Sequence, residues 1–230
     1  MKILMINGTM QKGSTYTIGK MFIERTASEE DSVKELFLPK DMPEFCRGCA
    51  VCIRQDEKKC PDYLIYMRRI TEMIDEADLL VFTSPVLVYH VSGQMKALLD
   101  HYGYRWMVHR PDASMFRKQA VCITTAAGAG MKKALRDMSD SLRYWGVARI
   151  YTYGVAVGGG IDDTNREKIE TAVHNLAEKI EHDASKVTPG LRVRILFYIM
   201  RFMQKRTGTT ETDKNYWEEK GWLGRNRPWK

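Results

Sequence analysis

The sequence predicts an α/β protein with a parallel sheet of five strands in the order 2-1-3-4-5, helices on both faces and a helical C-terminal extension. Short apolar runs typical of buried parallel strands recur between Ile3 and Val157. Segments with the spacing of amphipathic helices separate these runs. In a sheet of this order, ligands bind at the carboxyl ends of the strands, near the switch between the first and third strands.

The expected strands, in chain order, are Ile3–Ile6, Val33–Leu38, Leu79–Phe82, Ala120–Thr124 and Ala148–Val157. Between them, apolar side chains recur every three or four residues, which places them on one side of a helix. Three such faces are Val91, Met95, Leu98, Leu99 and Tyr102; Met131, Leu135, Met138, Leu142 and Trp145; and Ile169, Val173, Leu176 and Ile180.

Residues 186–230 are predicted to form a basic helical extension beyond a domain of residues 1–185. Thr188-Pro189-Gly190 interrupts the pattern, and Leu191–Arg206 follows as an amphipathic helix. Its expected apolar side carries Ile195, Leu196, Ile199, Met200 and Met203, opposite Arg194, Tyr198, Arg201 and Lys205. We expect this side, together with Trp217 and Trp222, to dock on the domain or on a partner subunit. An anionic membrane surface and an acidic protein partner are the alternatives.

The composition and charge exclude several classes of protein. The chain has 230 residues, of which 44% are hydrophobic, enough for the core of one domain. It contains no apolar run long enough for a transmembrane segment and opens without the features of a signal peptide, so a cytoplasmic location is expected. The net charge of +7 arises in the extension, because residues 1–185 are balanced. A neutral body with one basic appendage does not indicate a nucleic-acid-binding protein.

The loop after the first expected strand is rich in hydroxyl groups and runs directly into a helix containing Ile18 and Phe22. It has neither the dinucleotide-binding G-x-G-x-x-G nor the P-loop pattern. Free amides at a helix N-terminus favour a phosphate, and Thr9, Ser14 and Thr15 can donate to it while Lys12 adds attraction. The alternative is that Ser14 or Thr15 only caps the helix.

Two further loops follow the third and fourth expected strands. Pro85 fixes the backbone in an apolar stretch where a planar ring could lie, although a plain strand-to-helix turn is the alternative. The segment Thr124–Met131 is rich in small residues, which let the backbone approach a ligand closely or simply turn the chain. His90 is expected to be a surface residue.

These loops resemble motifs of the NADPH-dependent FMN reductase branch of the flavodoxin-like superfamily. Gly8–Thr15 is similar to the family's G-S-P-R-K-x-x-N-T turn, with Met10 and Gln11 in place of Pro-Arg. Ser84–Lys96 is similar to S-P-V-Y-x-x-x-x-S-G-x-x-K, with Leu87 in place of the usual aromatic residue. The resemblance implies a flavodoxin-like fold that binds FMN and uses NAD(P)H as co-substrate. The residues it implies for cofactor binding are Thr9, Lys12, Ser14, Thr15, Tyr16, Pro85, Val86, Leu87, Val88, Thr125, Ala126 and Gly128.

Four of the five cysteines, Cys46, Cys49, Cys52 and Cys60, fall within fifteen residues. Their spacing resembles the motif of the iron–sulfur flavoproteins of the same branch, which implies a [4Fe-4S] cluster on these thiols. A zinc site and a reduced loop without any metal are the alternatives. Cys122 lies within an expected strand and is predicted to belong to the core.

Together, the residues and the resemblance predict an FMN-dependent oxidoreductase that takes electrons from NAD(P)H and reduces a quinone, a flavin or a similar small acceptor. No catalytic side chain is predicted, because the cofactors carry the hydride chemistry. The alternatives are an iron–sulfur flavoprotein that passes electrons between redox proteins, and a binding module without turnover. The resemblance further implies a homodimer or homotetramer.

Overall fold

The computed structural model describes residues 1–42, 44–184 and 187–230. Five parallel strands form one sheet in the order β2-β1-β3-β4-β5. They are β1 (Lys2–Asn7), β2 (Ser32–Phe37), β3 (Leu79–Thr83), β4 (Gln119–Ala126) and β5 (Arg149–Ala156). The predicted fold class and strand order are confirmed, and each predicted strand lies within two residues of its observed bounds.

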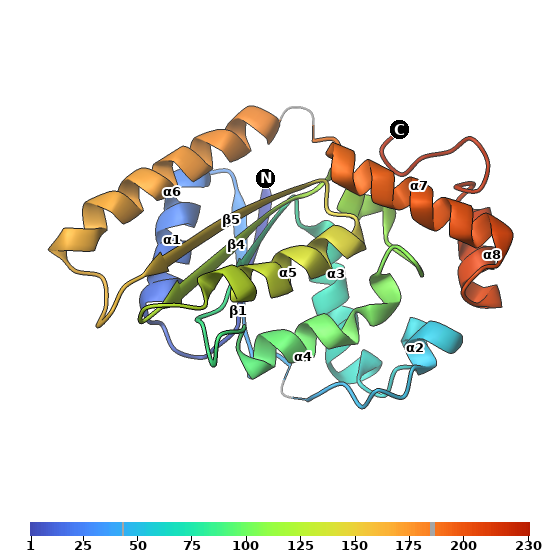
Figure 1. Ribbon diagram of the computed structural model, residues 1–230, viewed down its shortest axis with the longest axis horizontal. Coiled ribbons are helices and arrows are strands. Elements are labelled where there is room, and N and C mark those ends of the chain that lie inside the picture. The colour runs from blue at the N-terminus through green and yellow to red at the C-terminus, as the bar shows by residue number, and fades with distance from the viewer. Residues whose placement is uncertain (43, 185–186) are drawn as a thin grey trace.

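Helices cover both faces of this sheet (Figure 1). One face carries α1 (Ser14–Thr26) and α6 (Asp163–Ala184), and the other carries α3 (Arg68–Glu76), α4 (Gly93–His101) and α5 (Met131–Trp145). Side chains along a strand alternate between the faces, so Ile3 and Met5 of β1 pack with α1 and α6, whereas Leu4 and Ile6 pack toward α3, α4 and α5. Both faces of β1 are therefore buried, as expected for a central parallel strand.

Most side chains of the helical faces predicted from the sequence are buried, whereas Met131 and Leu135 are half-buried. Met95, Leu98 and Leu99 of α4 are buried, and Met138, Leu142 and Trp145 of α5 are fully so. Ile169, Val173, Leu176 and Ile180 of α6 lie against α1 and the sheet. Cys122 is buried in β4, which confirms its place in the core.

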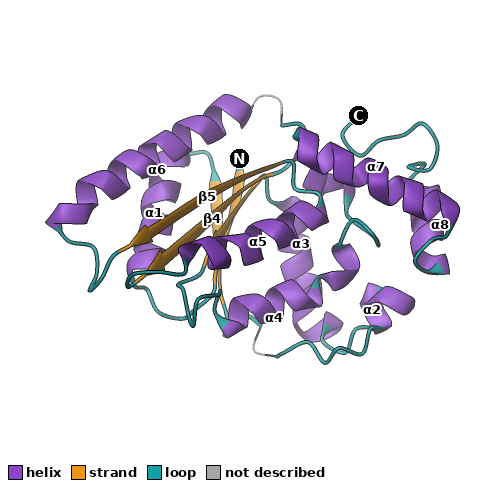
Figure 2. Ribbon diagram, viewed as in Figure 1, coloured by secondary structure: helices purple, strands orange, loops and turns teal. Residues whose placement is uncertain are grey.

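Short helical turns interrupt two of the connections, as Figure 2 shows. The cysteine-bearing connection from β2 to α3 contains α2 (Val51–Arg54), a 3-10 turn (Glu57–Lys59) and a π-helical turn (Tyr63–Met67). The connection from α4 to β4 contains two 3-10 turns, Gly103–Arg105 and Ala113–Arg117. None of the described helices is long and apolar enough to cross a membrane.

The C-terminal extension forms α7 (Leu191–Arg206) and α8 (Glu211–Glu219), at the end of the sheet where the strands begin (Figure 1). Gly190 N donates to Ala148 O beside the start of β5 (3.1 Å). The extension and the connection before β4 share an aromatic cluster, formed by Met107, Phe116, Val193, Phe197, Trp217 and Trp222. The predicted division after residue 185 lies outside the described residues.

The side of α7 that was expected to dock packs on the domain only in part, through Leu196 and Met200, and its docking on a partner subunit stays a prediction. Ile195, Ile199 and Met203 are 50%, 49% and 40% exposed, whereas Val193 and Phe197 are buried. The helix is apolar on most of its circumference, so residue spacing alone does not select a side. The choice depends on Phe197, whose ring packs against several aromatic rings of the C-terminal segment, including Trp217 at 5.1 Å between centroids.

Candidate functional site

Three loops meet at the carboxyl edge of the sheet, because β1, β3 and β4 are parallel neighbours. We call residues 8–13, 84–92 and 127–130 the three-loop edge. Gly8 N donates to Thr83 O (2.7 Å), Ser84 N donates to Ile123 O (3.1 Å) and Val86 N donates to Thr125 O (2.8 Å). These backbone bonds extend the ladder beyond the strands, so the loops are held against one another.

Ser92 joins the first two loops of the edge. Its Oγ donates to Gly8 O (2.6 Å) and accepts from Met95 N (3.2 Å), so Ser92 caps α4. Its backbone N–H donates to Ser84 Oγ (2.9 Å). A Cβ on Gly8 would lie 2.7 Å from Ser92 Oγ, so the approach of the two loops requires a glycine there.

The N-terminus of α1 faces the three-loop edge without a polar cap. The helix begins at Ser14 after Gly13, and no side chain of the described residues caps it or places an acidic group in its first turn. The alternative in which Ser14 or Thr15 serves as the cap therefore does not apply. Thr15 is buried and its hydroxyl shares a hydrogen bond with that of Thr125, whereas Ser14 is half-buried. The free amides and the helix dipole make this terminus favourable for an anion.

Lys12 and Tyr16 lie toward the β2 side of the edge. Lys12 Nζ is 5.4 Å from the centroid of the Tyr16 ring and 5.5 Å from that of Phe37. The Tyr16 hydroxyl donates to Glu35 Oε2 (3.2 Å), and partial burial followed by the charge of Glu35 raises the pKa of Tyr16. Thr9 Oγ1 donates to Gln11 O (3.4 Å) within the loop itself. The Tyr16 side chain is therefore engaged with β2.

The loop after β3 folds back on itself in a tight turn. Leu87 and His90 exchange backbone hydrogen bonds of 2.9 and 3.1 Å, and Val88 and Tyr89 between them have φ values of 49° and 69°. A positive φ is strained for a β-branched residue such as Val88, whose side chain is 93% exposed. Strain of this kind clusters at ligand-binding sites. Of the four residues of this loop that were predicted to bind the cofactor, Pro85 and Val86 at the base of the turn are half-buried, whereas Leu87 and Val88 are exposed.

The loop after β4 brings backbone to the same edge. Thr125 and Ala126 are buried at the end of β4, and Gly128 is exposed beyond them. Gly130 has a φ of 99°, and a Cβ there would lie 2.7 Å from Val86 Cγ1. This glycine therefore allows the loops after β3 and β4 to touch. His90 is exposed, and its Nδ1 lies 2.9 Å from Asp137 Oδ2, which agrees with the surface position predicted for it.

The family of the chain follows from its match, over residues 1–162, to the model of the NADPH-dependent FMN reductases. The chain belongs to this family. An iron-sulfur flavoprotein of Archaeoglobus fulgidus is 24% identical over 200 residues, which cover 83% of this chain and 85% of the relative.

Solved structures show the same fold as this FMN reductase family member. The structure of a flavone reductase aligns with 83% of this chain and with 66% of its own chain, with a TM-score of 0.60 and 16% identity. An FMN-dependent NADH-azoreductase from Bacillus anthracis in complex with FMN matches 78% of this chain and 99% of its own, with a TM-score of 0.60 and 12% identity.

The cysteine segment of this family member is held by the C-terminal extension. Arg110 donates to the backbone oxygens of Cys52 and Ile53 and forms an ion pair with Asp213 of α8. Cys52 and Cys60 are half-buried, whereas Cys46 and Cys49 are exposed. Burial, followed by the charges of Cys60, Cys46 and Cys49, raises the pKa of Cys52 to about 11.

The geometry of this segment does not form a metal site as it stands. Within residues 1–42, 44–184 and 187–230, no three His, Cys, Asp or Glu side chains are placed to hold a metal ion. The segment instead borders an open cavity of about 320 Å³ next to Asp100 and Gly103.

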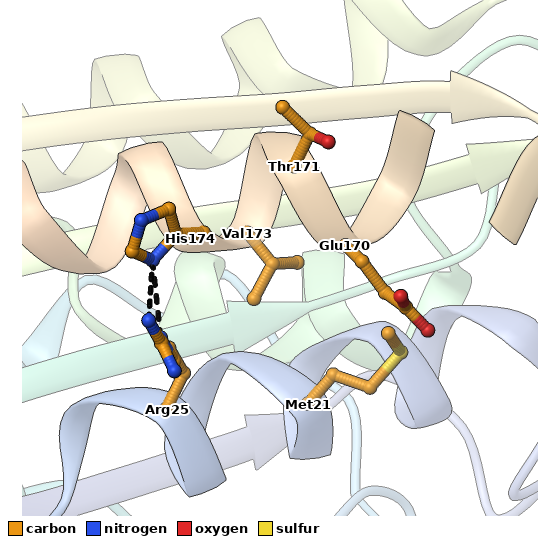
Figure 3. Close-up of a pocket in the computed structure, with 6 residues that line it drawn as sticks. All are labelled: Met21, Arg25, Glu170, Thr171, Val173 and His174. Atoms are coloured by element: carbon orange, nitrogen blue, oxygen red, sulfur yellow. Dashed lines mark hydrogen bonds between the residues drawn. The ribbon is translucent and has the colours of Figure 1, made fainter. Parts of the chain in front are cut away.

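A second cavity, of about 400 Å³, lies between α1 and α6, away from the three-loop edge (Figure 3). Arg25 reaches across it to His174, with 2.8 Å between Arg25 Nη2 and His174 Nδ1. Met21 and Val173 form its apolar floor. This cavity contains none of the residues predicted to bind a cofactor, and the contact of Arg25 with His174 ties two helices of the same layer together.

Sequence reasoning did not identify Ser84 or Tyr89 as residues of the site. Ser84 is fully buried and its hydroxyl supports Ser92, whereas Tyr89 presents a ring that is 57% exposed at the tip of the turn. Ser84 was visible within the motif Ser84–Lys96, but its bond to the Ser92 backbone requires the fold. Tyr89 could have been noticed as the nearest aromatic residue to Leu87.

Proposed function

We propose that this chain is an FMN-dependent oxidoreductase that takes electrons from NAD(P)H and reduces a quinone, a flavin or a similar small acceptor. The observation that carries the proposal is the meeting of three loops around the uncapped N-terminus of α1. Membership in the NADPH-dependent FMN reductase family supports it independently.

The residues of the three-loop edge fit the chemistry of FMN. A phosphate at the N-terminus of α1 would accept hydrogen bonds from backbone amides and from the Ser14 hydroxyl, and the helix dipole would stabilise its charge. Thr9 and Lys12 lie on the loop that leads to this terminus, and Thr15 supports it from below through Thr125. Tyr16 closes the β2 side through Glu35.

The apolar part of the flavin would lie along the loop after β3. Pro85 and Val86 form a fixed base, and the exposed side chains of Leu87 and Val88 are available to contact the ring. Backbone at Thr125, Ala126 and Gly128 would approach the pyrimidine edge of the ring, since small residues leave it accessible. Bound FMN supplies the acceptance and donation of electrons, and the protein orients it and shields one side from water.

An open apolar turn beside the ring suits a flat conjugated acceptor. Leu87, Val88 and Tyr89 are 49%, 93% and 57% exposed. Two structural neighbours bear the names of a flavone reductase and an azoreductase, and flavones and azo compounds are conjugated acceptors of this kind. We further propose that a second protomer, in a homodimer or homotetramer, completes the pocket over this turn.

Substitution of Ser14 tests the placement of the phosphate. Ser14→Ala should weaken FMN binding about tenfold or more, because a hydrogen bond to a charged group contributes about 1.5–3 kcal/mol. Thr17→Ala is the matched control, since this exposed hydroxyl lies one turn further along α1 and donates to Gly13 O (3.2 Å). The measurement is a titration of the apoprotein with FMN, followed by quenching of flavin fluorescence. Equal FMN affinities of the two variants would contradict the placement of the FMN phosphate at the N-terminus of α1.

The reaction itself is tested with the FMN-loaded protein under anaerobic conditions. NADPH or NADH should bleach the flavin absorbance, and a quinone or free flavin should restore it. A flavin that no pyridine nucleotide bleaches would contradict the reductase and favour a binding module.

A second candidate function is electron transfer by an iron–sulfur flavoprotein. It is favoured by the four clustered cysteines and by the name of the archaeal relative. The described thiols do not have the geometry of a metal site, so the cluster requires rearrangement of the segment Cys46–Cys60. Quantification of iron and sulfide after anaerobic purification decides between the candidates, since a carrier needs about four of each per chain.

A further inference from the structure

The outer side of α7 is apolar, although it faces away from the protein. Helices on a protein surface normally present polar residues there. Spacings of four, four and three residues instead bring four large apolar side chains into one row, which we call the α7 stripe. It consists of Leu191, Ile195, Ile199 and Phe202, which are 74%, 50%, 49% and 59% exposed. The opposite side of the helix holds Val193 and Phe197 in the aromatic cluster.

Positive charges border the stripe on both sides. All of α7 is described, and it contains five basic residues and no acidic residue: Arg192, Arg194, Arg201, Lys205 and Arg206. Arg201 is occupied by the backbone oxygens of residues 222–224, whereas the other four are exposed. By helical position, Arg192 lies on one side of the stripe and Arg194 and Lys205 lie on the other. Arg206 lies over the exposed ring of Phe202.

We propose that the α7 stripe binds the surface of an anionic lipid membrane, with the helix lying in the plane of the interface. Apolar side chains in the centre would enter the boundary of the acyl chains while the flanking cations contact lipid phosphates. With 16 residues and five cations, α7 is suited to lie on a bilayer and not to span it. This inference is independent of the proposed redox function.

The charge of α7 argues against the binding of a second copy of this chain to the α7 stripe. Face-to-face pairing of two α7 stripes about a two-fold axis would bring the flanking arginines and lysines of both copies together, with no carboxylate on either helix to compensate. An anionic surface has the opposite charge and an apolar layer beneath it, so it matches both features of the stripe.

Flotation of the full chain with lipid vesicles tests the proposal. The probes are vesicles of phosphatidylcholine alone and vesicles that also contain phosphatidylserine, at low and high salt. The protein should float with the phosphatidylserine vesicles only, and high salt should weaken the binding. Absence of flotation, or equal flotation with both kinds of vesicle, would overturn the proposal.

Two pairs of variants locate the contact. Ile195→Ser combined with Phe202→Ser should lower the vesicle partition coefficient by about tenfold per side chain, since each loses the burial of a large apolar group. Ile65→Ser is the control, because Ile65 is 66% exposed on a different segment. Arg192→Gln with Lys205→Gln should lower partitioning by about fivefold per charge, compared with Lys168→Gln and Lys179→Gln on α6.

Unfolding midpoints check that these exposed substitutions leave the fold intact. Wild-type partitioning of the serine variant would overturn the proposal. Sedimentation equilibrium tests whether the stripe instead binds a second copy of this chain. If the wild type does not bind vesicles but forms a dimer that the serine variant does not form, the stripe would be assigned to self-association. Binding to poly-L-glutamate in place of vesicles would assign it to an acidic protein.

Discussion

Gly8 marks the closest approach of the loops after β1 and β3. An added Cβ would lie 2.7 Å from Ser92 Oγ and 3.1 Å from both Ser84 Oγ and Thr83 O. Ser92 cannot move aside without losing its bonds to Gly8 O and Met95 N, and Thr83 O belongs to the backbone. The crowding therefore falls on groups that hold the three-loop edge together.

Gly8→Ala should lower the free energy of unfolding by about 1–3 kcal/mol, which is the usual range for overpacking of a rigid site. Urea unfolding followed by circular dichroism measures the change. Gly93→Ala is the control, because a Cβ at this neighbouring helical position meets no described atom within 4 Å and alanine favours the helix. A similar loss in both variants would show that the contact between the two loops is unimportant.

At the scale of the element, α8 is anchored by a buried carboxylate. Asp213 is fully buried, and its carboxylate accepts hydrogen bonds from Arg110, His109 and Thr209. Its Oδ2 lies 2.8 Å from both His109 Nδ1 and Thr209 Oγ1. Burial raises the pKa of Asp213, but the hydrogen bonds from His109, Thr209 and Thr210 outweigh it and hold the pKa below its usual value. The anchor also positions the cysteine segment, since Arg110 binds the backbone there.

Asp213→Asn should lower the stability near neutral pH by about 3–5 kcal/mol, because it removes the nearer carboxylate of the buried Arg110, whose other acidic partner, Glu57, lies 3.5 Å away and is partly exposed. The folded-state pKa of Asp213 is depressed, so its stabilisation is complete above the unfolded-state pKa of about 3.9 and is lost as the pH falls through the folded-state value. The difference between wild type and variant should therefore shrink below about pH 4.

Urea unfolding across the pH range measures this difference. Glu218→Gln is the control, since its pair with Lys214 is exposed and should contribute at most about 1 kcal/mol. A difference between wild type and Asp213→Asn that does not depend on pH would contradict the assigned role of the carboxylate.

Which elements could be predicted from the sequence depends on how distinct their apolar pattern is. The strands of the sheet are short apolar runs, which identified them directly. The helices α4, α5 and α6 have one apolar face each, so their periodicity indicated both the element and its orientation. In α7, apolar residues occur on most sides, and the packing of Phe197 with Trp217 and Trp222 selects the inner side. Those partners lie twenty or more residues away in the sequence, where periodicity carries no information.

The same contrast applies to the site. The strand pattern brings the loops of Ser14, Pro85 and Thr125 to one edge, and this convergence followed from the parallel order. The orientation of Tyr16 toward Glu35 and the left-handed turn at Val88 depend on side-chain contacts and backbone strain across the edge. The sequence has no local signal for either feature, since valine disfavours a positive φ.

At the scale of the whole molecule, the extension and the domain share one core. Met107 and Phe116 precede β4, yet they complete the cluster of Phe197, Trp217 and Trp222. Hydrogen bonds cross the same boundary, because Gln204 Nε2 donates to Val108 O (2.6 Å) and Trp217 Nε1 donates to His109 O (2.6 Å). We therefore propose that residues 1–185 and 186–230 fold as one cooperative unit.

Cooperative folding predicts that two different probes report the same unfolding transition. Three of the five tryptophans, Trp217, Trp222 and Trp229, lie in the extension, so tryptophan fluorescence weights it strongly, whereas far-ultraviolet circular dichroism follows all helices and the sheet. Phe197→Ala should lower the stability seen by both probes equally, by about 3–5 kcal/mol, because it removes the centre of the shared cluster. Phe202→Ala on the exposed side of the same helix should change either by no more than about 0.5 kcal/mol. A fluorescence transition that precedes the loss of circular dichroism, or a Phe197→Ala effect confined to fluorescence, would show instead that the extension unfolds independently of the sheet.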